Sequence, residues 1–142
     1  MGVSLTDRTL APPVFLAPLA GITDLPFRAL VARFGAGMVV SEMVASQEMV
    51  QAKPDARARA ELGAGLENTA VQLAGREARW MAQAARMAED MGARIIDINM
   101  GCPAKKVTSA SGSGASGSAL LREPDHALRL IEAVVGAVSV PV

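Results

Sequence analysis

The chain has 142 residues, about one average domain, and its 51% hydrophobic content excludes a disordered protein, while no apolar run is long enough to span a membrane. Fourteen basic residues balance fourteen acidic ones, and the zero net charge argues against a free-standing polyanion-binding module. The single cysteine, Cys102, excludes an internal disulfide and predicts a chain of the reducing cytoplasm without a metal site.

Short apolar runs and helical spacings alternate along the chain. The runs predict buried strands at residues 14–17, 38–41, 69–73 and 95–100, and a further strand that opens at 140–142. Helices are predicted after Thr23 as N-cap, with Pro26 in the first turn, and over 76–91 and 125–138. The spacing of the last helix predicts a buried face made by Leu128, Ile131, Val134, Val135 and Val138. Residues 44–68 are predicted to form one short helix and an exposed loop, because 48–60 has helical composition that Pro54 interrupts.

This alternation predicts an α/β fold with a parallel sheet. Four βα units in 142 residues give about 35 residues each, close to the repeat of a (β/α)8 barrel. An open doubly wound sheet fits the same pattern, and periodicity alone does not separate the two. In both folds the chemistry lies at the carboxyl ends of the strands.

Side-chain parity places three polar residues on one face of the sheet. Along 95–100 the side chains of Ile96, Ile98 and Met100 point one way, whereas Asp97 and Asn99 point the other way. Gln72 stands between Val71 and Leu73 and also points away from the helix layer. Such inward amides would orient a flat polar ligand, or they would satisfy each other inside a barrel.

Cys102 follows the strand at 95–100 in a turn made rigid by Gly101 and Pro103. A lone cysteine is often a small buried hydrophobe. Lys105 and Lys106 nearby would favour a nucleophilic thiolate, but if they point away the thiol stays protonated and can act as a general acid. The only histidine, His126, is interpreted as a first-turn surface residue and not as the base of a Cys–His pair.

The segment 112–117 matches the dinucleotide-binding pattern G-x-G-x-x-G letter for letter. No strand runs directly into it, and residues 108–118 contain only Ser, Gly, Ala and Thr. That composition is typical of a flexible linker, so we favour a loop over a Rossmann site.

Four segments occur in a fixed order: Ala17–Arg28 (APLAGITDLPFR), Ser41–Met43 (SEM), Val71–Gly75 (VQLAG) and Asp97–Val107 (DINMGCPAKKV). Gly117–Leu121 (GSALL) follows them. Together they resemble the motifs of the tRNA-dihydrouridine synthases, and most closely those of the bacterial B-type subgroup. The resemblance covers nearly the whole chain, from about residue 11 onward.

The resemblance implies a flavin-bearing TIM barrel followed by a small helical tRNA-binding domain. It implies NADPH-dependent reduction of a specific uridine in tRNA to dihydrouridine. Hydride would pass from reduced FMN to uracil C6, and Cys102 would protonate C5 as a general acid. The other residues carried over by motif are Pro18, Leu19, Ala20 and Gln72 for FMN, Asn99 for the flipped uracil, and Lys105 and Lys106 for tRNA phosphate.

A complete TIM barrel needs roughly 250 residues. We therefore expect residues 1–142 to form the N-terminal half of the FMN-binding catalytic domain, about four βα units, without the C-terminal half-barrel and the helical tRNA-binding domain. The chain alone is expected to be inactive and to bind FMN weakly. One alternative is a non-catalytic half-barrel that self-associates through its open edges. Another is a flavin barrel that reduces a free pyrimidine.

Overall fold

The structure is a computed structural model that describes residues 2–5, 8–109 and 115–142. The strands are β1 (Val3–Leu5), β2 (Arg8–Leu10), β3 (Phe15–Leu16), β4 (Met38–Val40), β5 (Val44–Ala45), β6 (Thr69–Ala74) and β7 (Ile95–Ile98). The helices are α1 (Leu25–Arg33), α2 (Ser46–Val50), α3 (Pro54–Ala60), α4 (Ala78–Asp90), α5 (Lys105–Thr108), the 3₁₀ helix η1 (Gly117–Arg122) and α6 (Pro124–Val135). Within these described ranges, no helix has both the length and the apolar character needed to cross a bilayer.

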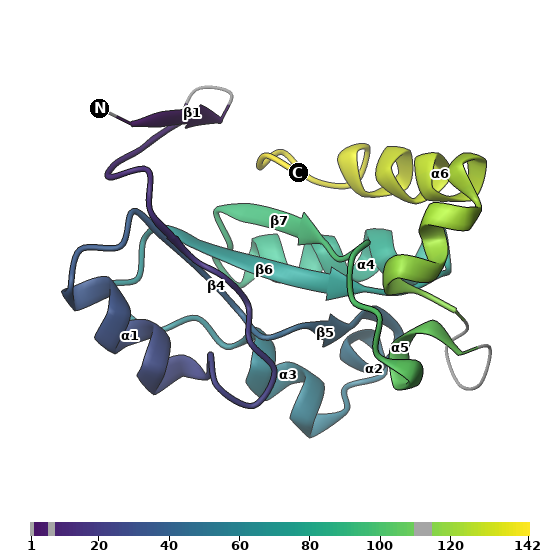
Figure 1. Ribbon diagram of the computed structural model, residues 1–142, viewed down its shortest axis with the longest axis horizontal. Helices are drawn as coiled ribbons and strands as arrows, with labels where there is room; N and C mark the ends of the chain where they lie inside the picture. Colours follow the sequence, from purple (N-terminus) through teal and green to yellow (C-terminus); the bar gives the residue numbers. More distant parts are fainter. Residues whose placement is uncertain (1, 6–7, 110–114) are drawn as a thin grey trace.

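The central sheet is parallel, as the alternating pattern predicts. β3 pairs with β4, β4 with β6, and β6 with β7, so the strands follow chain order across the sheet. β4 and β5 pair with successive parts of the same edge of β6, and together they form one strand position that is interrupted at residues 41–43. Consecutive order is typical of a (β/α)8 barrel, whereas a doubly wound sheet reverses its order at a switch point. The sheet seen here is open (Figure 1).

One face of the sheet carries the main core. Val71, Leu73 and Ile96 are fully buried there against helices α2, α3, α4 and α6, and Ile98 and Met100 pack against the same cluster. Figure 1 shows α4 lying along β6 and β7, with α1 and α6 at opposite flanks of the sheet. The predicted parity of the strand at 95–100 is therefore confirmed.

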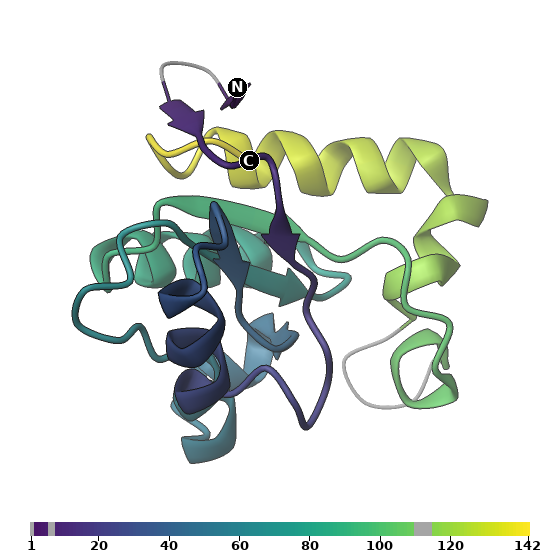
Figure 2. The same cartoon turned by 60° about the vertical axis from the view of Figure 1, so that its left-hand side comes forward.

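The other face is partly covered by an N-terminal hairpin that the sequence pattern did not predict. β1 and β2 pair antiparallel, with Val3 opposite Leu10. Leu10 packs with Val40, Ala70 and Ile95 in a second, smaller apolar cluster. Figure 2 shows the N-terminal hairpin and the C-terminal segment on the same side of the sheet, where Leu5, Pro141 and Val142 line a common pocket.

Two predicted helical segments differ in detail. The N-cap of α1 is Asp24 and not Thr23, because the Asp24 carboxylate accepts a hydrogen bond of 3.0 Å from the Phe27 backbone N–H. Pro26 does lie in the first turn, as predicted. Within residues 44–68, two short helices form where one was predicted, because Pro54 begins α3 and its small residues Ala56 and Ala60 are buried. A largely exposed loop follows α3 at residues 61–68.

The C-terminal segment also departs from its pattern. On α6 the buried residues are Ala127, Leu130 and Val134, whereas the predicted face residues Leu128, Ile131 and Val135 are exposed. The helix carries two apolar stripes, and the one that contains the small Ala127 allows the close approach to the core. Residues 140–142 form no assigned strand, although the Pro141 carbonyl accepts a 2.9 Å hydrogen bond from the Ile96 N–H.

Glu89 fastens the segment after α6 to the end of α4. Its carboxylate accepts hydrogen bonds from the Ser139 hydroxyl and from the backbone N–H groups of Ser139 and Val140. The hydroxyl bond has the largest effect, and together the bonds lower the pKa of Glu89 below its ordinary value of 4.5. The ionised carboxylate therefore stabilises the fold at neutral pH, and this contribution is lost as the pH falls from 4.5 through the lowered pKa.

We expect the Glu89→Gln variant to be less stable than the parent chain at neutral pH and to lose that deficit in acid. The measurement is the urea midpoint of both proteins at about pH 7 and about pH 3. An equal difference in midpoint at the two pH values would contradict this role of Glu89.

Candidate active site

The polar residues predicted on the inner face do lie together at the carboxyl ends of β6 and β7. The Gln72 side-chain NH2 donates to the Asp97 carboxylate at 2.5 Å, and the Asn99 side-chain NH2 donates to the Gln72 oxygen at 2.9 Å. Gln72 is 7% exposed, and Asp97 and Asn99 are half-buried. The amides therefore do satisfy each other, which was one of the two alternatives. Their place at the ends of the strands leaves the other alternative, contact with a flat polar ligand, open as well.

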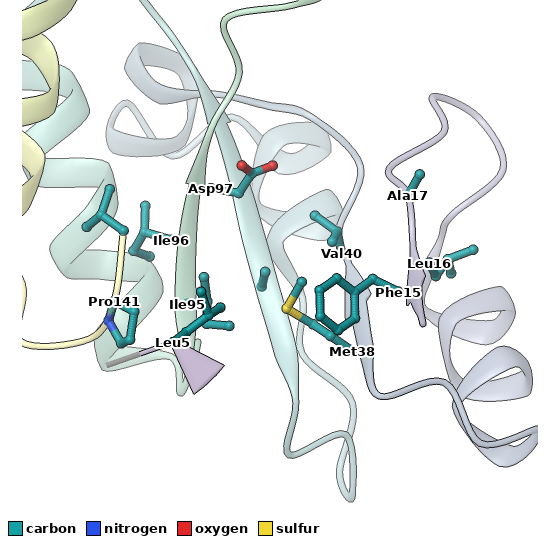
Figure 3. A pocket seen from close by; sticks show the side chains of 12 residues that line it. Leu5, Phe15, Leu16, Ala17, Met38, Val40, Ile95, Ile96, Asp97 and Pro141 are labelled. Atoms are coloured by element: carbon teal, nitrogen blue, oxygen red, sulfur yellow. The ribbon is translucent and has the colours of Figure 1, made fainter. Parts of the chain in front are cut away.

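The same face of the sheet carries an open apolar pocket of about 350 Å³. Asp97 is the only charged side chain among the residues that line it in the described part of the chain. Figure 3 shows the Asp97 carboxylate near one end of the pocket, with Ile95 and Leu5 further along it. Asp97 therefore lies where the polar cluster meets an apolar surface.

Cys102 is held by the side chain of Asn99. The Asn99 oxygen accepts hydrogen bonds from the backbone N–H of Cys102 at 3.0 Å and of Gly101 at 3.3 Å. On the other side of the turn, the Cys102 carbonyl accepts a 3.0 Å hydrogen bond from the Ser118 N–H. Cys102 is a free, half-buried thiol. These bonds place it on a rigid turn directly after the amide cluster.

The start of η1 packs against the Cys102 turn, and only glycine fits there. Gly117 has φ +58°, and a Cβ at this position would lie 2.6 Å from the Cys102 carbonyl oxygen and 2.9 Å from Val107 Cγ1. We expect Gly117→Ala to destabilise the chain by about 2 kcal/mol and to speed alkylation of Cys102, because the turn must move.

The matched control for that substitution is Gly101→Ala on the same turn, where a Cβ would meet nothing within 4 Å. Urea unfolding and the rate of iodoacetamide modification are measured for both variants. Equal stability and equal thiol reactivity in the two variants would contradict the close approach of η1 to Cys102.

The loop with the residues predicted to bind FMN follows β3 and is fixed from both sides. Leu19 is 44% exposed, Ala20 is exposed and Pro18 is half-buried. The Thr23 hydroxyl accepts from the Leu19 N–H at 3.0 Å, and the Glu42 carboxylate accepts from the Gly21 N–H at 2.6 Å. The loop therefore presents a small, pre-formed apolar surface beside the sheet.

Ser41 and Glu42 lie in the segment 41–43, which the sequence places at the carboxyl end of the second strand, but neither residue was assigned a role there. Ser41 is fully buried, and its hydroxyl oxygen accepts a 3.0 Å hydrogen bond from the Gln72 backbone N–H. This bond replaces a sheet bond that the interruption between β4 and β5 removes. Residues 41–43 thus connect two parts of the site. Glu42 bonds to the loop at Gly21, and Ser41 bonds to β6 at Gln72.

Arg76, directly after β6, is a second residue that was missed. Its guanidinium donates to the Ala115 carbonyl at 3.2 Å and forms a 2.6 Å ion pair with Glu123, which holds the pKa of Glu123 below its ordinary value. His126 lies in the first turn of α6, as predicted, and its Nε2 is 2.7 Å from the Arg76 carbonyl oxygen. Arg76 therefore anchors the segment that returns to the Cys102 turn.

The remaining predicted site residues lie further out. Lys105 and Lys106 are exposed on the short helix α5, beyond Cys102. The glycine-rich pattern at 112–117 falls largely outside the described residues, as does much of the linker predicted at 108–118; residues 110–114 are not described.

Comparison with known proteins bears on this arrangement. The family model described as Dihydrouridine synthase (Dus) matches residues 15–142, which include every predicted site residue. The chain belongs to the dihydrouridine synthase family. The family's TIM-barrel fold agrees with the parallel sheet in consecutive order described above.

Several curated dihydrouridine synthases are similar to this chain. A probable tRNA-dihydrouridine synthase of Rhodobacter capsulatus is 70% identical over 144 residues, which cover 100% of this chain and 43% of that relative. A probable tRNA-dihydrouridine synthase of Rhizobium leguminosarum is 61% identical, over 91% of this chain and 39% of the relative. The tRNA-dihydrouridine synthase B of Xanthomonas campestris is 48% identical, over 94% and 39%. The chain thus spans about two fifths of the length of these dihydrouridine synthases.

Proposed function

We propose that this chain is the N-terminal part of the catalytic domain of a tRNA-dihydrouridine synthase that reduces uridine in tRNA to 5,6-dihydrouridine. The observation that carries the proposal is the Cys102 thiol, held by Asn99 on a rigid turn beside the Gln72 amide in a dihydrouridine synthase chain. The names of the similar relatives support tRNA as the substrate. The same proposal includes a C-terminal half-barrel and a helical tRNA-binding domain, neither of which is formed by residues 1–142.

The residues present fit FMN as the cofactor. Gln72 and Asn99 each have a second amide hydrogen that no described residue accepts, and these donors suit the carbonyl edge of a flavin ring or of a uracil. The exposed loop at Pro18, Leu19 and Ala20 suits the apolar body of a flat ring. When bound and reduced by NADPH, FMN would supply the hydride for uracil C6.

The chain's own residues would bring the uracil into position and protonate it. Cys102 Sγ would give its proton to C5 as C6 receives hydride, so that the C5–C6 double bond becomes a single bond and the thiolate regains a proton from water. Asn99 would contact the flipped uracil, and Lys105 and Lys106, exposed beyond the turn, would meet tRNA phosphates. A reducing cytoplasm would keep the Cys102 thiol free for this role.

The test uses the full-length protein, FMN, NADPH and an unmodified tRNA transcript. We expect dihydrouridine in the digested tRNA by mass spectrometry, and none when free uridine replaces tRNA. Parallel reactions with NADH decide the reductant. Reduction of free uridine and not of tRNA would favour a flavin barrel acting on a free pyrimidine, and no dihydrouridine in either reaction would overturn the proposal.

The isolated 142-residue chain is expected to bind FMN weakly or not at all and to be inactive, because it spans about two fifths of its relatives' length. The measurement is the flavin content of the purified chain and its FMN titration by fluorescence. A stoichiometric yellow flavin after gel filtration would contradict this expectation.

A non-catalytic half-barrel that self-associates is the second candidate. The exposed apolar residues Leu128, Ile131 and Val135 on α6 favour it, because apolar stripes of this kind mark surfaces that other chains cover. Sedimentation of the isolated chain distinguishes the candidates: a monomer with a cooperative thermal transition counts against self-association.

A further inference from the structure

Asp97 stands at the head of a directional chain of hydrogen bonds. A carboxylate only accepts hydrogen bonds, so the Gln72 amide must turn its NH2 group toward Asp97, where the distance is 2.5 Å. The Gln72 oxygen then faces Asn99 and accepts from the Asn99 NH2 at 2.9 Å. The Asn99 oxygen is left for the Cys102 turn, where it accepts from the Cys102 N–H at 3.0 Å.

We propose that Asp97 is a positioning residue, which holds one end of this chain of bonds and thereby strengthens the hold of both side-chain amides on the Cys102 turn. The two carboxamides can each present either an oxygen or an NH2 group, and their orientation is fixed at one end by the Asp97 carboxylate and at the other by the backbone N–H groups of Gly101 and Cys102. Asp97 lies half-buried beside an apolar pocket, where such bonds are stronger than in water.

This orientation has a consequence for recognition, which rests on the proposed function. The Asn99 oxygen already accepts from the N–H groups of Gly101 and Cys102. Asn99 therefore has only an amide hydrogen left for a ligand, and it donates to a ring carbonyl instead of pairing with the imide N–H of uracil. Gln72 likewise offers a free amide hydrogen. Asp97 thus makes the cluster a donor surface that selects a carbonyl-bearing ring.

The test is hydrogen exchange of the Cys102 backbone amide, measured by NMR in the full chain without flavin or tRNA. We expect the exchange to be about fivefold faster in Asp97→Asn, because a neutral amide accepts the Gln72 hydrogen bond more weakly than a carboxylate does and so loosens the chain of bonds that ends at the Cys102 N–H. The double variant Asp97→Asn with Gln72→Glu places the carboxylate at residue 72, the next member of the chain of bonds, where it accepts from the Asn99 NH2 group. We expect this variant to restore the exchange rate to within about twofold of the parent.

The Asn99 backbone amide is the internal control, because its N–H donates to the Leu73 carbonyl at 2.9 Å and takes no part in the side-chain chain of bonds. Equal acceleration of both amides would mean general loosening and would overturn the proposal, as would an unchanged Cys102 rate or a double variant that fails to restore it. The test needs no turnover. A protein that makes no dihydrouridine but shows this exchange pattern would overturn the proposed function alone.

Discussion

Replacement of Cys102 by alanine is expected to slow uridine reduction in tRNA by about a hundredfold to ten-thousandfold, the usual contribution of a positioned general acid. Cys102 is the only cysteine in the chain, and it lies on the turn that follows the Gln72 and Asn99 amides. Hydride addition at C6 would leave a carbanion-like C5 that needs a proton from a donor held beside it. Flavin binding should be unchanged, because Cys102 is not among the residues assigned to FMN.

The measurement is single-turnover reduction of tRNA by the full-length protein with its flavin reduced beforehand, so that the reaction with NADPH does not contribute. Cys102→Ser is the matched variant, since a hydroxyl has the same shape but gives up its proton less readily, and we expect it to be nearly as slow as alanine. Full activity of Cys102→Ala on tRNA would show that the general-acid assignment is wrong.

Replacement of Arg28 by alanine is expected to destabilise the chain by about 3 kcal/mol, because a large buried side chain and two charge-assisted hydrogen bonds are lost together. Arg28 is 0% exposed, and its guanidinium donates to the Thr23 carbonyl at 3.1 Å and to the Glu61 carbonyl at 2.8 Å. Burial lowers its pKa, and the nearby carboxylates of Asp24, Glu42 and Glu61 act in the opposite direction.

Arg28 thus fastens the loop after β3 to the segment after α3. Its Nη1 has no hydrogen-bond partner among the described residues, so part of the cost of burying the guanidinium is not recovered. Arg33→Ala, at the exposed end of the same helix, is the matched control and should change stability by less than about 0.5 kcal/mol. Urea unfolding of both variants measures the difference. Similar urea midpoints for the two variants would show that Arg28 does not stabilise the fold.

The strands and longer helices could be predicted because each has a strong period. The alternation along residues 95–98 and the stripe along α4 both follow from burial on one side. The N-terminal hairpin carries no comparable signal, since its two strands have three residues each and, among their described side chains, Leu10 alone is buried, through contact with Val40, Ala70 and Ile95. The buried face of α6 was predicted only in part: Val134 and Val138 contact the core, whereas Leu128, Ile131 and Val135 are exposed. The two apolar stripes of this helix look alike in the sequence, which does not show which neighbour covers them.

In the candidate site, parity predicted the shared face of Gln72, Asp97 and Asn99, because alternation is a local property of a strand. The bonds from Glu42 to Gly21 and from Arg76 to Ala115 could not be predicted, since each joins residues far apart in the sequence. In both bonds the partner is a backbone group, which every residue carries. The sequence therefore does not indicate which backbone group the Glu42 or Arg76 side chain will contact.

The consecutive order of the strands also bears on how the chain is made. β4, β6 and β7 each pair with a strand that precedes them in the parallel sheet. During synthesis, each of these three strands leaves the ribosome when the edge with which it pairs is already present. Contacts between neighbouring units keep loop-closure costs low. Assembly can therefore proceed in the direction of translation, with each unit serving as the template for the next.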